Sequence, residues 1–259
     1  MKQSYVVRSV IYILLQSVVY GFGNPLTKAA YESITPFWCL FFRFSLAFLI
    51  FMIFFGKSII RQIKAARLSD ILPASFCMAF AYICCNIALS LTSATNVGFL
   101  MSLPVIFAPV LSTIILKEHY SLSHLPLQIL VIVGLVLLCI QGGSLSFNIG
   151  DMFALFTAFF IAGSLVFGKK SLGAQLDAIT ISASQAGCTA AFSLIFALLF
   201  DDLDVIPHIQ PAAWGVVVYL AVFCTCLLYT SSRLRFYPLL RLRSRLRIPP
   251  PYSALCRYP

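Results

Sequence analysis

The stretch that decides the fold runs from Leu91 to Glu118 and reads LTSATNVGFLMSLPVIFAPVLSTIILKE. Between residues 96 and 116 it carries no charge, and as an α-helix it covers about 31 Å, enough to cross the hydrocarbon core of a bilayer. Pro104 and Pro109 lie inside it, and each frees a backbone carbonyl four residues earlier. Because freed carbonyls need a partner inside lipid, we expect this span to pack within a bundle or to line a cavity.

The composition of the whole chain also indicates a membrane protein. Of its 259 residues, 61% are hydrophobic and 10% are charged, and the mean hydropathy is +0.97. Soluble proteins carry roughly 25% charged residues. Apolar runs of about 20 residues, separated by short polar joints, favour many helices over a barrel of alternating strands. The sequence therefore predicts an all-α integral membrane protein, a multi-span helical bundle.

About eight spans are expected, at residues 9–28, 34–56, 71–91, 95–116, 125–142, 151–168, 178–200 and 212–230. Lys and Arg are retained in short cytoplasmic loops. With the N-terminus inside, only Lys28 falls in an outer segment, and the inner segments hold Lys2, Arg8, Lys57, Arg61, Lys64, Arg67, Lys117, Lys169 and Lys170. The N-terminus is thus predicted to be cytoplasmic.

Three predicted helices carry polar stripes that are candidates for a substrate pathway. At 100° per residue, polar side chains share one face in the first, third and seventh spans. From these stripes we select Gln16, Tyr20 and Asn24, then Tyr82, Asn86 and Ser90, and finally Gln185 and Thr189, and we add Pro104 of the fourth span. Hydrogen bonding between packed helices is the alternative explanation for such stripes.

The second span combines an aromatic ridge with a single cation. Phenylalanines recur at steps of three and four residues from Phe37 to Phe55, and this ridge is expected to face lipid. Arg43 points about 120° away from it and lies near the middle of the bilayer, where an unpaired cation costs several kcal/mol. Two readings remain open for Arg43. It is a counter-ion for an anionic substrate group or a gating charge, or it is a structural residue satisfied by carbonyls or water.

The sequence gives little support for metal binding or enzymatic catalysis. Eight of the nine cysteines lie in apolar runs without nearby His or acid, so they are expected to pack as small hydrophobes and to bind no metal. His119, His124 and His208 all lie in joints, and neither H-E-x-x-H nor G-x-S-x-G occurs. We therefore expect neither an enzyme nor a cofactor.

Several motifs together resemble the EamA-type drug/metabolite transporters. They are VYGFGNPLTK at 19–28, the segment 36–43, and the segment 88–118, in which Pro104 falls where that family has its fourth-helix Pro-Val. A second copy begins at Gly150 with GDMFAL. The resemblance implies ten helices in two inverted five-helix repeats, a central substrate site and alternating access.

This resemblance divides the chain into a first repeat at 1–144 with five spans, an incomplete second repeat at 150–230 with three spans, and a tail at 231–259. The tail has seven Arg, five Pro and no acid, and we interpret it as the product of a shifted reading frame or a misplaced gene end. Because the tail supplies +7 of the formal net charge of +10, that charge gives no reason to expect nucleic-acid binding.

The leading functional prediction is a secondary transporter, an exporter of small metabolites or drug-like molecules, in a bacterial inner membrane. No G-x-x-x-x-G-K-[ST] motif is present for nucleotide binding, so coupling is expected to use a gradient, with a proton as the coupling ion. Its partners would be a small-molecule substrate and the lipid bilayer, and a homodimer is left open. The alternative is a transport-inactive, truncated membrane protein or a scaffold fragment.

Overall fold

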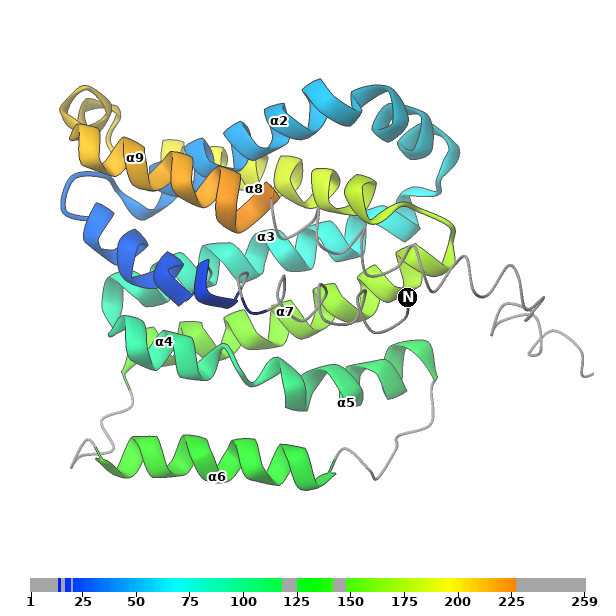
Figure 1. Ribbon diagram of the computed structural model, residues 1–259, viewed down its shortest axis with the longest axis horizontal. Coiled ribbons are helices and arrows are strands. Elements are labelled where there is room, and N and C mark those ends of the chain that lie inside the picture. Colours follow the sequence, from blue (N-terminus) through cyan, green and yellow to red (C-terminus); the bar gives the residue numbers. More distant parts are fainter. Residues whose placement is uncertain (1–13, 15–16, 20, 118–124, 142–147, 227–259) are drawn as a thin grey trace, which may run out of the picture.

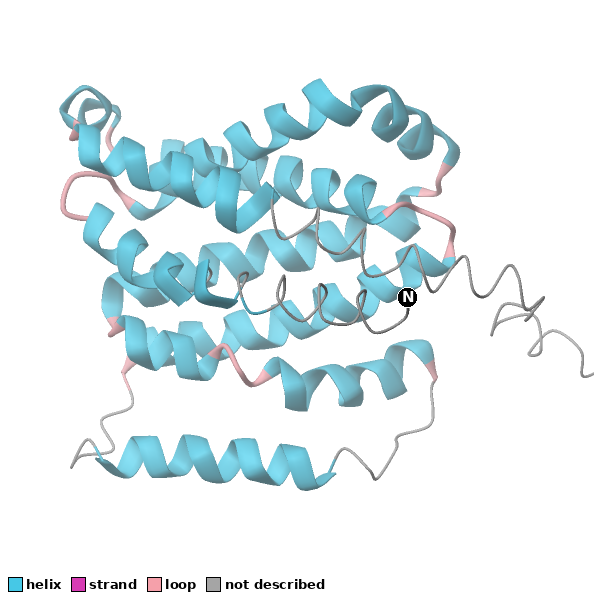
Figure 2. Ribbon diagram, viewed as in Figure 1, coloured by secondary structure: helices cyan, strands magenta, loops and turns pink. Residues whose placement is uncertain are grey.

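The computed structural model describes residues 14, 17–19, 21–117, 125–141 and 148–226, and every regular element in these ranges is a helix (Figures 1 and 2). The first helix is described over residues 17–19 and 21–30. The later helices are α2 (Pro36–Ala65), α3 (Leu68–Leu91), α4 (Ala94–Leu100), α5 (Pro104–Leu116), α6 (Leu125–Gln141), α7 (Ile149–Gly173), α8 (Ala178–Phe200), η2 (Leu203–His208), α9 (Pro211–Tyr219) and η3 (Leu220–Cys226).

Helix length and surface composition identify a multi-span integral membrane protein. Five segments in the described ranges are long and apolar enough to cross a bilayer: α2, α3, α4 together with α5, α7 and α8. Large apolar side chains are exposed on their outer faces, for example Leu49, Ile53 and Phe54 of α2 at 56%, 76% and 73%. A monomer in water rarely exposes apolar surface so extensively, whereas lipid solvates it.

The fourth span is broken instead of being one kinked helix. Residues 101–103 form a turn, and Pro104 is the first residue of α5, where its missing N–H is not needed. The Leu100 carbonyl, which Pro104 deprives of its helical donor, accepts a hydrogen bond from the Leu103 N–H at 3.1 Å. The Val105 carbonyl, freed by Pro109, lies 3.5 Å from the side-chain amide of Gln128 on α6. Both freed carbonyls therefore have partners.

Helix α2 is longer than the predicted span, which ended at residue 56. It continues through the basic segment to Ala65, and its 30 residues cover about 45 Å. The segment contains neither Gly nor Pro after Gly56, and Ile59 is buried at 1% exposure against α8 residues such as Ala183. Packing of the apolar side of this segment extends the helix beyond the bilayer core.

The bundle centre is built on small side chains. Helix α3 runs beside α7, and α2 beside α8, while α5 packs on α7 and α6 lies beyond α5 (Figure 1). In α7 the alanines Ala154, Ala158 and Ala162 are fully buried, at the four-residue spacing that allows close approach of helices. Small residues therefore bring the axes of α3 and α7 close together.

Most of the aromatic ridge of α2 faces protein, so the prediction that the ridge faces lipid is wrong, although Phe55 at its end is 38% exposed. Phe44 and Phe51 are 2% and 4% exposed, and Phe37 contacts Phe196 of α8 with ring centroids 5.6 Å apart. Gly187 of α8 makes room for the Phe48 ring, because a Cβ at this position would come within 3.1 Å of it. Aromatic rings fill the space that this glycine and the alanines of α8 leave open.

One end of the bundle, which we call the Asp151 rim, gathers the turns after the first helix and α3 and the starts of α2, α4 and α7. Asp151 is 5% exposed and forms a capping box with Asn148 at the start of α7. Its carboxylate also accepts from the hydroxyl of Thr92 at 3.0 Å and from the amide of Asn96 at 3.4 Å. This network joins the end of α3 to the starts of α4 and α7.

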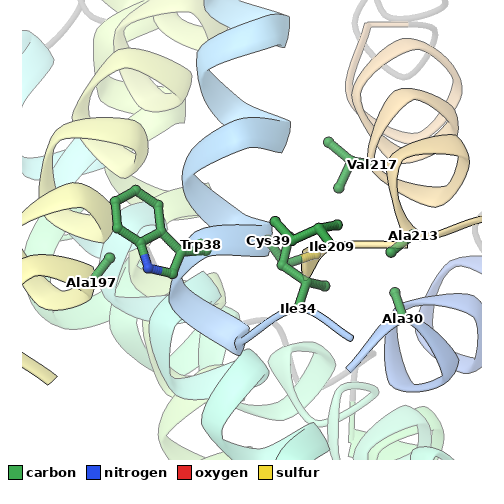
Figure 3. Packing of buried hydrophobic residues seen from close by; sticks show 8 residues of the cluster. All are labelled: Ala30, Ile34, Trp38, Cys39, Ala197, Ile209, Ala213 and Val217. Carbon is green, nitrogen blue, oxygen red and sulfur yellow. The ribbon is translucent and has the colours of Figure 1, made fainter. Parts of the chain in front are cut away.

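A hydrophobic cluster at the same rim holds the first helix, α2, α8 and α9 together. Figure 3 shows Trp38 of α2 beside Ala197 of α8, while Cys39 lies toward Ile209 and Val217 on the other side of α2. Ala30 at the end of the first helix completes this side. The cluster fixes the first helix against α2, which positions the cavity described next.

Candidate functional site

A small polar cavity lies between the first helix, α2, α3 and η3. Its volume of about 20 Å³ is enough for about one water molecule. Its walls combine amide, hydroxyl and guanidinium groups with apolar side chains, and its lining residues are Gly23, Asn24, Thr27, Arg43, Tyr82, Cys85, Asn86, Leu89, Met101, Leu220 and Cys224. We call it the Arg43 cavity.

Arg43 is the cationic side chain of this lining, and it is only 8% exposed. Its carbon Cζ lies 5.1 Å from the centroid of the Phe44 ring and 5.4 Å from that of Tyr82, so two aromatic faces flank the charge. A guanidinium stays protonated in proteins and offers five N–H donors. Its burial in an apolar bundle is costly unless the surroundings compensate the charge, which makes this residue a functional candidate.

The π-helical turn η3 supplies a hydrogen-bond partner for Arg43. The Nε of Arg43 lies 3.4 Å from the hydroxyl oxygen of Thr225. That hydroxyl donates to the carbonyl of Leu220, five residues earlier, at 3.0 Å. Since π-turns are frequent at functional sites, the local geometry of η3 agrees with a specialised role for this region.

Asn86 of α3 connects the cavity to the end of the first helix. Its amide nitrogen donates to the Tyr82 carbonyl at 2.8 Å, which fixes the orientation of the side chain. Its amide oxygen accepts a hydrogen bond from the hydroxyl of Tyr31. The first helix and α3 are therefore tied by a side-chain bond at one end of the cavity.

A wider hollow of about 660 Å³ lies next to the cavity at the Asp151 rim. Its lining includes Lys28, Tyr31, Glu32 and Ser90, and Leu89 lines both hollows. The amine of Lys28 donates to the backbone carbonyl of Thr92 on the rim. Leu89 lines both hollows, and a hydrogen bond joins Tyr31 of the wider hollow to Asn86 of the Arg43 cavity, so we call these three residues the partition.

The structure brings together part of the predicted pathway. Asn24, Arg43, Tyr82 and Asn86 all line the Arg43 cavity, and Ser90 lines the wider hollow. The amide of Asn24 lies 3.8 Å from the sulfur of Met101, a weak contact. Gln16 and Tyr20 lie outside the described residues.

The other three predicted residues line neither hollow. Pro104 is buried at the α4–α5 break. Gln185 donates to the hydroxyl of Ser164 on α7 at 3.0 Å, and Thr189 bonds the Gln185 carbonyl in its own helix. The stripe on α8 therefore lies in a helix–helix interface, and substrate contact by these residues stays a prediction.

Three residues in or next to the two hollows were not among the predicted site residues. Tyr31 lines the wider hollow and lies in the turn after the first helix, beyond the predicted span that ended at residue 28. Thr225 sits between Cys224 and Cys226, and nothing in the sequence signals that its hydroxyl faces Arg43. Met101 lies in the turn that separates α4 from α5, where a continuous helix was expected.

Metal ligation finds no support in the described part of the chain. No cluster of three or more His, Cys, Asp or Glu side chains occurs among these residues. Six of the cysteines in the described ranges are free thiols, and two of these six, Cys85 and Cys224, line the Arg43 cavity.

Membrane transport proteins share this feature, a polar cavity inside a multi-span bundle. The EamA-like transporter family model matches residues 7–140 and 148–232, and the chain belongs to this family. It is also similar to an uncharacterized transporter of Archaeoglobus fulgidus, with 29% identity over 153 residues. That alignment covers 59% of this chain and 46% of the relative, so the chain spans about half the length of the curated relative that it matches. No solved structure matches the chain.

Proposed function

We propose that this protein is a secondary transporter that moves small organic molecules by alternating access, with the Arg43 cavity on the substrate path. The observation that carries the proposal is a guanidinium, 8% exposed, in a polar cavity that adjoins a wider hollow at the partition. A central polar site that opens in turn to either side of the membrane is the geometry that alternating access requires.

The positions of charged residues support an orientation for this path. Lys and Arg gather at the end of the bundle opposite the Asp151 rim, for example Lys64 and Arg67 between α2 and α3. By the positive-inside rule this end is cytoplasmic, as is the N-terminus, and the wider hollow then faces the outside. We place the protein in a bacterial inner membrane and assign it outward transport.

The absence of a phosphate-binding loop from the sequence supports coupling to a gradient instead of to nucleotide hydrolysis. A proton is the ion that we propose. The two-repeat division at 1–144 and 150–230 is part of the same proposal, since inverted repeats that rock against each other give alternating access.

Substrate flux tests this function. The full chain is reconstituted in liposomes and screened against small organic acids, amines and neutral metabolites, with Arg43→Ala and Arg61→Ala compared for each substrate that moves. Arg61 lies on the same helix but is exposed at its basic end, so it controls for the loss of one guanidinium. We expect Arg43→Ala to lower flux at least about tenfold, since a central charged contact to substrate is worth more than about 1.4 kcal/mol.

Two results would count against this function. Unchanged flux in Arg43→Ala would remove Arg43 from the substrate path. No flux for any compound, from a folded and monodisperse protein, would favour the alternative of a transport-inactive scaffold.

A further inference from the structure

We propose that the Arg43 cavity selects the carboxylate group of a small organic monoanion, which reaches it from the wider hollow through the partition. This names the substrate class of the transporter proposed above and rests on that function. The argument has three steps: the charge of the cavity, its shape, and the way into it.

The charge of the cavity is positive at every physiological pH. Among its described lining residues Arg43 carries a charge that does not titrate, and none is acidic. The acidic residues of the described chain lie in turns or near helix ends, at Glu32, Asp70, Asp151, Asp177, Asp201, Asp202 and Asp204. Because the surroundings are apolar and screen poorly, an anion is attracted into the cavity and a cation is repelled.

The shape of the cavity suits a planar, two-oxygen group. A guanidinium binds a carboxylate through two parallel N–H···O bonds, and the Phe44 and Tyr82 rings flank it at 5.1 and 5.4 Å. With space for about one water, the closed cavity must widen before a carboxylate enters it. Leu89 and Leu220 in its walls would meet the apolar body of the ligand once the cavity widens.

The way in passes Tyr31. The hydroxyl of Tyr31 holds Asn86, and beyond this bond lies the wider hollow with one cation, Lys28, and one acid, Glu32. Because these two charges have opposite signs, the wider hollow discriminates little between anions and cations. Selection therefore takes place at Arg43, behind the partition.

Thiol labelling measures this selection without requiring transport. In a full-length chain whose other cysteines are replaced by serine, Cys85 reports on the cavity that it lines. It is treated from the outside with two methanethiosulfonate reagents, one bearing a sulfonate and one a trimethylammonium group. The anion-to-cation ratio of labelling rates is compared among the native Arg43, Arg43→Gln, Arg43→Lys and the control Arg61→Gln, so the intrinsic reactivities of the reagents cancel.

We expect Arg43→Gln to lower this ratio by about tenfold or more, the scale on which a buried field concentrates ions. Arg43→Lys keeps the charge and should retain most of the ratio, and Arg61→Gln should leave it unchanged. An equal ratio in Arg43→Gln and the parent chain overturns the proposal. So does a failure of both reagents to reach Cys85 in the parent chain, because the cavity would then not open to the outside.

A competition experiment identifies the chemical class of anion that binds in the Arg43 cavity. Propionate, propionamide and chloride are added separately at constant ionic strength during labelling with the sulfonate reagent. Protection by propionate alone supports a carboxylate site, whereas equal protection by chloride indicates a halide site and overturns the substrate class. If the labelling ratio depended on Arg43 but no compound showed flux, the anion site would stand and the transporter function would be rejected. If only neutral or cationic compounds showed flux and the labelling ratio did not depend on Arg43, only the anion site would be rejected.

Discussion

At position 31 a tyrosine hydroxyl fastens the partition between the two hollows through its bond to Asn86. Tyr31→Phe removes this bond and keeps the ring. The net contribution of one hydrogen bond to stability is about 0.5–1.5 kcal/mol. Its loss should increase the population of molecules with an open partition about two- to tenfold, because 1.4 kcal/mol corresponds to a factor of ten in an equilibrium constant. The measurement is the alkylation rate of Cys85 by a small neutral maleimide in a chain with no other cysteine.

Tyr219→Phe is the matched control for this substitution, since its hydroxyl bonds the Val19 carbonyl at 3.0 Å and takes no part in the partition. If Tyr31→Phe and Tyr219→Phe changed the Cys85 rate equally, the partition would not be the barrier.

Gly150 allows the close approach of α7 to the end of α3. A Cβ at this position would lie 2.9 Å from the Cβ atoms of both Leu91 and Thr92, so Gly150→Ala must displace one of the two segments. We expect a loss of about 1–3 kcal/mol in the free energy of unfolding, typical of overpacking. Thermal unfolding in nanodiscs measures it.

Gly168, on the same helix, provides the control. A Cβ there meets nothing within 4 Å, so Gly168→Ala should be neutral or stabilising by up to about 1 kcal/mol. Equal stability of the two alanine variants would contradict the close packing at the Asp151 rim.

Side-chain periodicity identified polar stripes whose surroundings differ in the structure. Asn24, Tyr82 and Asn86, selected by helical spacing, line the same cavity as Arg43, and their contact with a substrate stays a prediction. The same rule applied to Gln185 and Thr189 identified a real stripe, but that stripe is buried against neighbouring helices. Periodicity shows which residues share a face, and it does not distinguish a hydrated face from one packed on another helix.

At the scale of elements, the start of α2 is capped by a residue from a distant segment. The Asp201 carboxylate, at the end of α8, accepts from the Thr35 hydroxyl at 2.5 Å and from the backbone N–H of Trp38. Burial nevertheless raises the pKa of Asp201 above its ordinary value, with nearby Asp202 adding to the rise and the two hydrogen bonds opposing it.

The raised pKa of Asp201 gives a defined pH dependence. The folded state binds this proton more tightly than the unfolded state, in which the pKa is about 3.9, so stability falls as the pH rises above this value and through the raised pKa. Asp201→Asn should remove this part of the fall, as measured by unfolding midpoints between about pH 4 and 7. Asp204→Asn, an exposed change of equal charge, is the control. An unchanged pH profile in Asp201→Asn would contradict the assignment.

Helix ends were predictable from the sequence where charged residues interrupt an apolar run. The predicted span 178–200 coincides with α8, which acidic residues delimit at Asp177 and Asp201. The break before Pro104 was expected only as a kink, because Pro at an interior position and Pro at the start of a new helix look alike in a sequence. The aromatic ridge of α2 was assigned to lipid for a similar reason, since both lipid and a glycine- and alanine-rich partner helix accommodate phenylalanine.

At the scale of the whole molecule, the all-α membrane bundle and the family were predicted from hydropathy and motif order, and both are confirmed. Hydropathy works here because a bilayer forces each backbone donor into a helix. The arrangement of the helices around Arg43 was not predictable, since it depends on which small residues meet across α3, α7 and α8. The tail at 231–259 lies outside the described residues, and its interpretation as a frame-shifted segment stays a prediction.

The central claim is that this bundle contains a water-accessible path around Arg43, and accessibility mapping tests it most directly. In a cysteine-free chain in liposomes, single cysteines are placed at Asn24, Tyr82 and Asn86 on the cavity side and at Leu49, Ile53 and Phe54 on the exposed side of α2, then exposed to a water-soluble thiol reagent. We predict labelling at the three cavity positions and none at the three outer ones, which face acyl chains. Labelling at the outer positions with protected cavity positions would contradict the account.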